Sequence, residues 1–371
     1  MTKLEELIQK LCPDGVEFCP LEQCCNILDR KRKPVTKSAR EAGDYPYYGA
    51  NGIQDYVSDY IFDGTFILVG EDGSVITDRG TPVVTWASGK IWVNNHAHII
   101  EESGDVLLRY LYHYIQTIDV SPLIHGNIPK LTGGDFKALQ IPVPPLPVQR
   151  EIVRILDNFT ELTAELTAEL TARKKQYAYY RDKLLTMGTE QVAVCNLGDI
   201  ADIYTGSKPN EILDTISDYE YINAGTGNSG YTEQPNCEGD TVTTPSRGQG
   251  GIGYVGYQSK PFYLGPLCYA IRSKTQEFII NKYIYHWLVS HSSDILVLKN
   301  EGGTPALNKT DLAKIRIKVP PLSVQNRLVE VLDNFDAICT DLSSGLPAEI
   351  EARQKQYEYY RDKLLSFEEK I

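Results

Sequence analysis

The sequence predicts an α+β protein in which two similar globular α/β domains alternate with two long α-helices. Three observations lead to this prediction. A helical segment occurs twice, apolar residues within each copy follow a helical spacing, and the stretches between the copies contain apolar strands with glycine turns. A chain of 371 residues is long enough for two domains, and its hydrophobic fraction of 42% is typical of folded proteins.

The internal repeat has an offset of 176 residues. PPLPVQREIVRILDNF begins at Pro144, and PPLSVQNRLVEVLDNF begins at Pro320. A later block repeats with an offset of 180, as RKKQYAYYRDKLL from Arg173 and RQKQYEYYRDKLL from Arg353. The second copy therefore contains four additional residues between its two conserved blocks. Shorter matches extend the repeat upstream: Cys19 matches Cys195, Leu21 matches Leu197, and Ile141 matches Ile317.

Each copy of the repeat has the apolar spacing of a coiled-coil helix. Steps of three and four residues alternate along the first copy at Ile152, Ile155, Phe159, Leu162 and Leu166. We therefore predict spacer helices over residues 146–189 and 322–371, and globular domains over residues 1–145 and 190–321. The four extra residues are close to one helical turn, so we expect them to keep the apolar seam on one face.

The two spacer helices are expected to differ in regularity. The first contains tandem TAEL tetrads from Thr163, and each tetrad adds about 6 Å to a helix. The second is interrupted by Ser343-Ser-Gly-Leu-Pro347. We expect the helix to kink or restart there, with Ser343 or Ser344 as the N-cap and Pro347 in the first turn.

The N-terminus and the cysteines predict a cytoplasmic protein. The first 12 residues form an amphipathic helix with charges throughout, unlike a secretory signal peptide, and no run of about 18 apolar residues is present. The eight cysteines include no C-x-x-C pair and no zinc-ribbon spacing, so we expect them to be reduced core residues. The six histidines show no metal-ligand spacing, and we predict no metal site.

Two domains, each followed by a PPLxxQxxIxxxLDxF helix that ends in RxKQYxYYRDKLL, resemble the specificity subunit of type I restriction–modification systems. The TAEL tetrads and a G-x-x-P-x-L turn before each helix, from Gly126 and Gly302, strengthen the resemblance. It implies two target recognition domains that each read one half of a bipartite DNA sequence. It also implies antiparallel spacer helices, a pseudo-twofold repeat, and a helical ruler that fixes the gap between the half-sites.

The same resemblance implies the partners. Two modification (methyltransferase) subunits would dock on the helices, and restriction subunits would complete the complex. This chain would have no active site, and S-adenosylmethionine, ATP and Mg would be bound by the partner subunits. Aromatic residues on more than one helix face suggest where partners dock, although packing against the protein's own domains is an equal alternative. The expected docking residues are Tyr177, Tyr180, Arg181, Tyr357, Tyr360 and Arg361.

The sequence also bears on two alternative functions. A two-domain scaffold would leave unexplained why the globular domains diverge while the helices match. A self-sufficient, cofactor-dependent DNA-modifying enzyme would need a catalytic constellation, and the chain contains no Asn/Asp-Pro-Pro-Tyr motif. G-x-G-x-x-G occurs from Gly225 and from Gly248, but neither copy opens a helix, so neither predicts a dinucleotide site.

The net charge of −12 bears on how DNA would be bound. It predicts that the isolated chain binds DNA weakly and that partner subunits supply much of the phosphate contact. Candidate contacts in the first domain are Arg30, Lys31, Arg32, Lys33, Asn51, Arg79, Asn127 and Lys130. Candidates in the second are Lys208, Asn228, Arg247 and Gln249. The cluster Arg30-Lys-Arg-Lys33 is equally consistent with a solvated loop. Arg247 is the strongest single candidate, because its loop, TPSRGQGG, is rich in glycine and allows close backbone approach.

Overall fold

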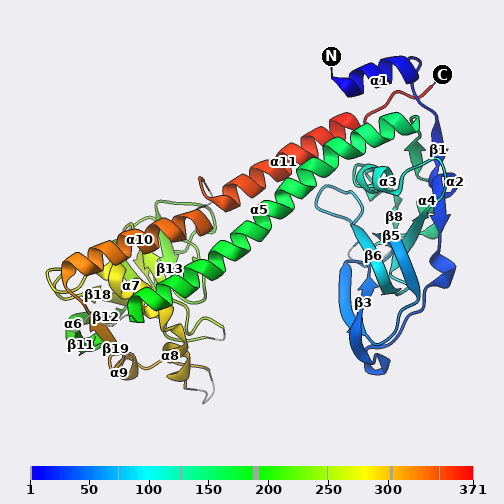
Figure 1. Cartoon of the computed structure of the whole chain (residues 1–371). Helices are drawn as coiled ribbons and strands as arrows, with labels where there is room; N and C mark the ends of the chain where they lie inside the picture. The colour runs from blue at the N-terminus through cyan, green and yellow to red at the C-terminus, as the bar shows by residue number, and fades with distance from the viewer. Residues whose placement is uncertain are drawn as a thin grey trace. The chain divides into compact units, whose positions relative to one another are not determined.

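The computed structural model describes residues 2–73, 75–125, 128–186, 192–248, 250–300, 304–341 and 343–370. The chain forms two compact units. Unit 1 consists of Met1–Leu166 with Ile350–Ile371, and unit 2 of Thr167–Glu349. Each unit contains one globular domain and part of both repeat copies, so segments far apart in the sequence complete the same core (Figure 1).

The first globular domain contains a six-stranded sheet with the order β2-β7-β5-β6-β3-β4. Short helices and turns connect the strands and cover the sheet. The elements are α1 (Lys3–Leu11), β1 (Phe18–Pro20), α2 (Leu21–Cys24), β2 (Cys25–Ile27), the 3-10 turns η1 (Asp29–Lys31) and η2 (Lys37–Ala39), β3 (Ala42–Gly49), β4 (Gly52–Val57), β5 (Phe62–Gly70), β6 (Val84–Val93), β7 (Ala97–Glu102), α3 (Leu108–Ile115), η3 (Ser121–Leu123), β8 (Ile124–His125), β9 (Lys130–Leu131), α4 (Gly133–Ala138) and β10 (Gln140–Pro142).

The second globular domain contains a four-stranded sheet, β12-β18-β15-β16, and a three-stranded sheet, β14-β13-β17. Its elements are β11 (Ala193–Asn196), α6 (Leu197–Ile200), β12 (Ala201–Thr205), β13 (Tyr219–Ile222), β14 (Tyr231–Thr232), β15 (Thr241–Pro245), β16 (Gly256–Gln258), β17 (Tyr263–Leu264), β18 (Cys268–Ser273), α7 (Asn281–Ser290), α8 (Ser292–Val297), α9 (Lys309–Leu312) and β19 (Arg316–Val319).

The two domains share a strand order that their sequences hardly reveal. β2-β7-β5-β6 in unit 1 corresponds to β12-β18-β15-β16 in unit 2, and every neighbouring pair in both sets is antiparallel. Unit 1 extends this order with β3 and β4. The expected likeness of the two domains is therefore confirmed for their four-stranded framework.

A two-stranded ladder at the base of each domain is also duplicated. β1 pairs with β10 and places Cys19 opposite Ile141. β11 pairs with β19 and places Cys195 opposite Ile317. These four residues are the matches that the sequence showed at an offset of 176. Each ladder brings the chain back to its starting point, directly before the next spacer helix begins.

The spacer helices confirm the predicted break. The first is one helix, α5 (Leu146–Thr186), and the second consists of α10 (Leu322–Thr340) and α11 (Leu346–Leu364). The predicted serine N-cap is wrong, because the hydroxyls of Ser343 and Ser344 bond to the Asp341 carboxylate. Gly345 directly precedes α11 and accepts a hydrogen bond from the Glu349 amide. The four extra residues therefore lie at this break, not in a continuous apolar seam.

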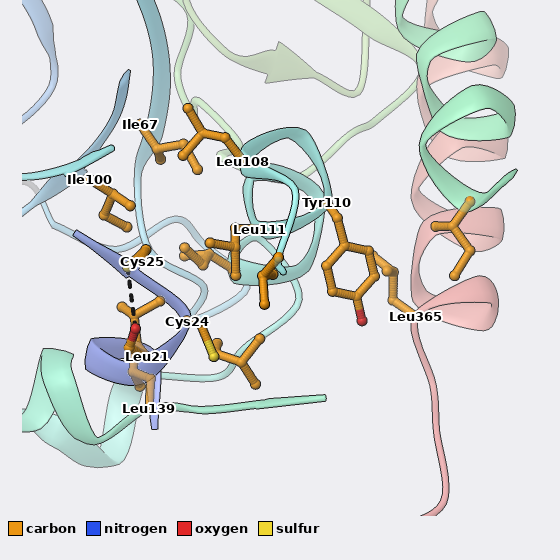
Figure 2. Packing of buried hydrophobic residues seen from close by; sticks show 14 of the residues in the cluster. Leu21, Cys24, Cys25, Ile67, Ile100, Leu108, Tyr110, Leu111, Leu139 and Leu365 are labelled. Carbon is orange, nitrogen blue, oxygen red and sulfur yellow. Dashed lines mark hydrogen bonds between the residues drawn. The ribbon is translucent and has the colours of Figure 1, made fainter. Parts of the chain in front are cut away.

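The core of unit 1 joins the globular domain to both helices. Figure 2 shows Leu108, Tyr110 and Leu111 of α3 among buried residues from α2, β5 and β7, with Leu365 from the end of the chain beside Tyr110. Val148, Ile152 and Leu156 of α5 belong to the same cluster. The eight cysteines are free, with six buried and two half-buried, which agrees with the structural role expected of them.

Unit 2 repeats this packing with the roles of the helices exchanged. Leu185, near the end of α5, is buried in its core with Leu332 of α10 and Trp287 of α7. The aromatic contacts agree: Phe159 stacks on Tyr360 in unit 1, and Phe335 stacks on Tyr180 in unit 2. In both units the beginning of one spacer helix lies beside the end of the other, as antiparallel helices require. Across the described parts of the chain, no helix is long and apolar enough to cross a membrane.

The glutamine of each PPLxxQ motif fixes the start of a helix in the globular domain. Gln149 accepts from the amide of Leu107, the N-cap of α3, and donates to the carbonyls of Asp105 and Pro144. Gln325 accepts from the amide of Ile280, the N-cap of α7, and donates to the carbonyls of Phe278 and Pro320. Both glutamines are fully buried. In each unit, a glutamine of the repeated spacer helix thus determines where a helix of the globular domain begins. We call the parts that repeat in both units, namely the spacer helices and the two-stranded ladders, the constant frame.

Replacement of Gln149 by alanine should destabilise unit 1. The Leu107 amide and two carbonyls would lose a buried partner, at a cost of about 2–5 kcal/mol. Denaturant unfolding followed by circular dichroism measures this cost. Gln23→Ala, at an exposed glutamine of α2, is the matched control and should leave the midpoint unchanged. Equal midpoints for the two variants would contradict the role of Gln149.

Candidate nucleic-acid interface

The basic segment of unit 1 lies on the turn that follows β2. Arg30 and Lys31 lie in η1 and are exposed, as is Lys33. The end of β6 holds the segment in place. The Lys33 amide donates to the Val93 carbonyl, and the Trp92 indole donates to the Lys33 carbonyl at 2.6 Å. Three of the four predicted cations are therefore presented to solvent by a fixed turn.

Arg32 points in the opposite direction and anchors that turn. Its guanidinium contacts Glu71 at 2.6 Å, donates to the Ala97 carbonyl at 2.6 Å, and lies 3.6 Å from Asp29. The Arg32 guanidinium is occupied by contacts within the domain, and no local pattern in the sequence distinguishes it from its basic neighbours. Its contribution is to position Arg30, Lys31 and Lys33.

The same cluster has the composition of a metal site. Ligand atoms of Asp29, Glu71 and His98 lie within 4.8 Å of one another. However, Arg32 and Lys130 already supply positive charge, and Lys130 Nζ lies 3.1 Å from Glu71. Burial raises the pKa of Asp29, but hydrogen bonds from His98 and Ile99 outweigh it, and the pKa is lowered overall. These residues form a self-neutralised network that ties η1, β5, β7 and β9 together.

The remaining candidates of unit 1 are dispersed. Asn51 is exposed in the turn between β3 and β4. Arg79 is exposed but forms a 2.6 Å ion pair with Glu358 of α11. Lys130 pairs with Glu71 as described above, and Asn127 lies outside the described residues. The structure therefore groups Arg30, Lys31 and Lys33 and leaves the other candidates apart.

Unit 2 presents a cavity beside the glycine-rich loop that follows β13, and a second glycine-rich loop lies next to that loop. The cavity has a volume of about 140 Å³ and is lined by the loop after β13, including Asn228, and by residues of β15 and β16. Several glycines of the two loops have a positive φ, including Gly225 at +85° and Gly248 at +116°. The loops touch: a side chain at Gly251 would lie 3.0 Å from the Gly225 amide nitrogen.

The candidates of unit 2 gather around this cavity only in part. Asn228 lines it and is exposed. Arg247 is exposed on the adjoining loop, where its backbone bridges to Ala306. Lys208 is exposed on a separate segment after β12, and Gln249 lies outside the described residues. Sequence reasoning missed Gln258 and Glu220, which line the cavity, because neither lies in a glycine-rich stretch.

A buried histidine joins each globular domain to both spacer helices. His113 of α3 lies 2.8 Å from Asp157 of α5 and 2.9 Å from the Tyr357 hydroxyl of α11. His286 of α7 lies 2.7 Å from Asp333 of α10 and 3.4 Å from the Tyr177 hydroxyl of α5. Asp157 and Asp333 are the aspartates of the two LDNF motifs, and Tyr177 and Tyr357 begin the two YxYY motifs.

A basic residue completes both contacts. Arg109 donates to Asp157 at 2.7 Å, and Lys282 lies 3.5 Å from Asp333. Arg109 also lies 4.7 Å from the ring centroids of Trp86 and Tyr112, and Lys282 lies 3.9 Å from that of Tyr257. The motif RYLYH in α3 thus corresponds to KYIYH in α7. The sequence shows both segments as tyrosine-rich helices, but it does not reveal that the histidine and the basic residue of each contact a spacer helix.

Most of the tyrosines and arginines predicted to dock partners form contacts within their own unit. Tyr177 and Tyr357 bond to the histidines, and the guanidinium groups of Arg181 and Arg361 lie 5.5 and 5.7 Å from their rings. Tyr180 and Tyr360 stack on Phe335 and Phe159 with part of each ring exposed. The residues in between, Tyr179 and Tyr359, are 60% and 62% exposed. Packing against the protein's own domains therefore accounts for Tyr177 and Tyr357.

The protonation of the His113 contact follows from its partners. Asp157 accepts from Nε2, so Nδ1 is free to accept from the Tyr357 hydroxyl. Burial raises the pKa of Tyr357 to about 12, which keeps that hydroxyl protonated. Burial lowers the pKa of His113, despite the opposing effect of Asp157. The neutral ring is therefore the form that fits this site.

Comparison with known proteins decides the family. The type I restriction modification DNA specificity domain matches the chain twice, over residues 13–173 and 189–352. The chain belongs to this family. A putative type I restriction enzyme specificity subunit of Haemophilus influenzae is 36% identical over 99% of this chain and 98% of its own length. The EcoR124I/EcoR124II specificity subunit of Escherichia coli is 36% identical over 79% of this chain and 80% of its own.

Solved structures of the type I specificity family share the fold. The S subunit of a type I restriction–modification system from M. genitalium aligns with a TM-score of 0.64 at 19% identity, covering 95% of this chain and 96% of that one. A chain from a structural study of complex assembly and conformational transition of the type I system aligns with a TM-score of 0.57 at 15% identity, covering 95% and 98%. The expected family and the α+β fold with two repeated domains are confirmed.

The stability of unit 1 should decrease in mild acid. Because the pKa of His113 is lower in the folded chain than in the unfolded one, the unfolded chain binds more protons below about pH 6.5. This contribution to stability is complete above that pH and is lost as the pH falls. We expect the melting temperature to drop between pH 7 and pH 5.5, with a shallower dependence in His113→Gln. Identical pH dependence in both proteins would exclude His113 as the source.

Proposed function

We propose that this DNA specificity subunit of a type I restriction–modification complex recognises a bipartite duplex DNA target, with one half-site for each globular domain. The observation that carries this proposal is that the two units share the same repeated contacts but have different exposed loops. The ladders, the PPLxxQ glutamines and the histidine contacts repeat, whereas the loops differ. They carry the exposed Arg30, Lys31 and Lys33 in one unit and border a cavity with a mixed polar and apolar lining in the other. Divergent loops on a constant frame suit a ligand whose two halves differ.

The two domains would use different contacts. In unit 1, Arg30, Lys31 and Lys33 are well placed to neutralise phosphates, and Arg32 holds their turn. In unit 2, Arg247 is the side chain with the reach and the two parallel donors for guanine. The net charge of −12 supports weak binding by the isolated chain and phosphate contacts from partner subunits.

Methyl transfer and DNA cleavage would reside on partner subunits in the cytoplasm. We propose that two modification subunits dock on the spacer helices, and that restriction subunits complete the complex. S-adenosylmethionine, ATP and Mg would then be bound by the partners. The exposed rings of Tyr179 and Tyr359, at the same place in the two repeat copies, support a docking surface on each helix. As docking candidates, Tyr179 and Tyr359 replace Tyr177 and Tyr357, because the hydroxyls of Tyr177 and Tyr357 bond to His286 and His113 inside the units.

Deletion of residues 163–166, one TAEL tetrad, should change only the gap in the target. The tetrad lies within α5, and its loss shortens the helix by about 6 Å while leaving both loop sets intact. A map of modified bases in host DNA, with and without the gene, reveals both half-sites of the wild-type target. The deletion should keep both half-sequences and reduce their separation. A changed half-sequence would refute the ruler.

Replacement of Arg247 by alanine should weaken the reading of one base pair in one half-site. A bidentate contact from arginine to guanine contributes about 1–3 kcal/mol of discrimination. Arg316→Ala is the matched control, because Arg316 is exposed in the same unit but lies on β19. Competition binding with single-base variants of the target measures the difference. If discrimination stays the same at every position of that half-site, Arg247 does not contact a base.

A further inference from the structure

The cavity of unit 2 contains polar groups that the fold does not use. Its polar lining includes the amides of Asn223, Asn228 and Gln258, the carboxylate of Glu220 and the hydroxyl of Thr243. The Asn223 carbonyl oxygen accepts from the Leu267 amide at 3.0 Å and is therefore occupied. The side-chain amides of Gln258 and Asn228, in contrast, form no hydrogen bond to any residue that the structure describes.

Gln258 lies at a fixed place in the framework. It ends β16, where its backbone pairs with the buried Thr241 of β15. Gln258 is half-buried, whereas Asn228 is exposed on the loop between Gly227 and Gly230. A side chain on a sheet has a better-defined position than one on a loop, and Gln258 is thus the better determinant of specificity.

The walls of the cavity allow a ligand to approach the backbone. A side chain built at Gly225 or at Gly227 would meet no atom within 4 Å, so the space above both residues is open. Tyr254 lines another side with an exposed ring. The cavity is therefore open to solvent beside Gly225 and Gly227, and Gln258 and Tyr254 both line it.

The charge of the cavity selects against phosphate. Glu220 lines it and is exposed, and none of its lining residues is a lysine or an arginine. A carboxylate repels a phosphate at close range and accepts hydrogen bonds from an amino group. Of the groups that DNA presents, the cavity therefore favours a base edge with an exocyclic amino group, which in the major groove means adenine or cytosine.

We propose that this cavity reads the major-groove edge of adenine through Gln258, with Asn228 and Glu220 at its rim. An amide carries one acceptor and one donor side by side, which match the N6 amino group and N7 of adenine. Cytosine offers only its amino donor, and guanine offers two acceptors. The inference rests on the proposed function and adds to it the base class that the second domain takes at one position.

The test uses the full chain assembled with its modification subunits and a pool of randomised duplex DNA. The wild-type complex should enrich a split motif with adenine at one position that depends on Gln258. In Gln258→Ala, the preference for adenine at that position should fall roughly 5- to 150-fold. In Gln258→Glu, the position should shift from adenine toward cytosine, because a carboxylate only accepts.

Gln234→Ala is the matched control, at an exposed glutamine of the same unit that does not line this cavity. It should retain the wild-type motif, and circular dichroism should show that every variant is folded. Unchanged preferences in both Gln258 variants, or a changed position that is not adenine, would overturn the inference and leave the proposed function intact. Failure of the wild-type complex to enrich any split motif would overturn both.

Discussion

Each unit depends on one buried histidine held by two helices. His113 and His286 each lie between an aspartate of the following spacer helix and a tyrosine of the other one. A buried polar ring is costly unless both nitrogens have partners, so each contact forms only when three separate segments meet in one arrangement. The contact therefore specifies how a globular domain is oriented on its helices. Its occurrence in both units explains why the aspartate and tyrosine motifs are duplicated with the helices.

The constant frame and the variable loops are physically separate. The glutamines at 149 and 325 define where α3 and α7 begin, and the ladders close each domain at its base. Strands β2-β7-β5-β6 and β12-β18-β15-β16 then build the same framework from different residues. Because these contacts fix the frame, the loops at Arg30 and at Gly225 are free to differ without loss of stability. The exposed loops of the two units accordingly differ, with three exposed cations on one and glycines at the rim of a cavity on the other.

The acidic net charge of the chain is compatible with DNA recognition, because some basic residues form ion pairs within the fold while others remain exposed. Arg32 and Lys130 are neutralised by Glu71, and Arg79 by Glu358, so several basic residues serve the fold. Arg30, Lys31, Lys33 and Arg247 remain exposed. One unit thus presents a small cationic turn, and the other presents a cavity whose lining includes no lysine or arginine.

The sequence by itself determined the repeat, the spacer helices, the break near Gly345 and the family, because these follow from local spacing that a linear reading detects. It also identified the aspartate and tyrosine motifs, but not what they do. Only the tertiary structure decided that Tyr177 and Tyr357 face inward, that Arg32 anchors its own turn, and that Gln258 and Glu220 line one cavity. Each of these depends on contacts between segments far apart in the chain, whose pairing no local pattern encodes.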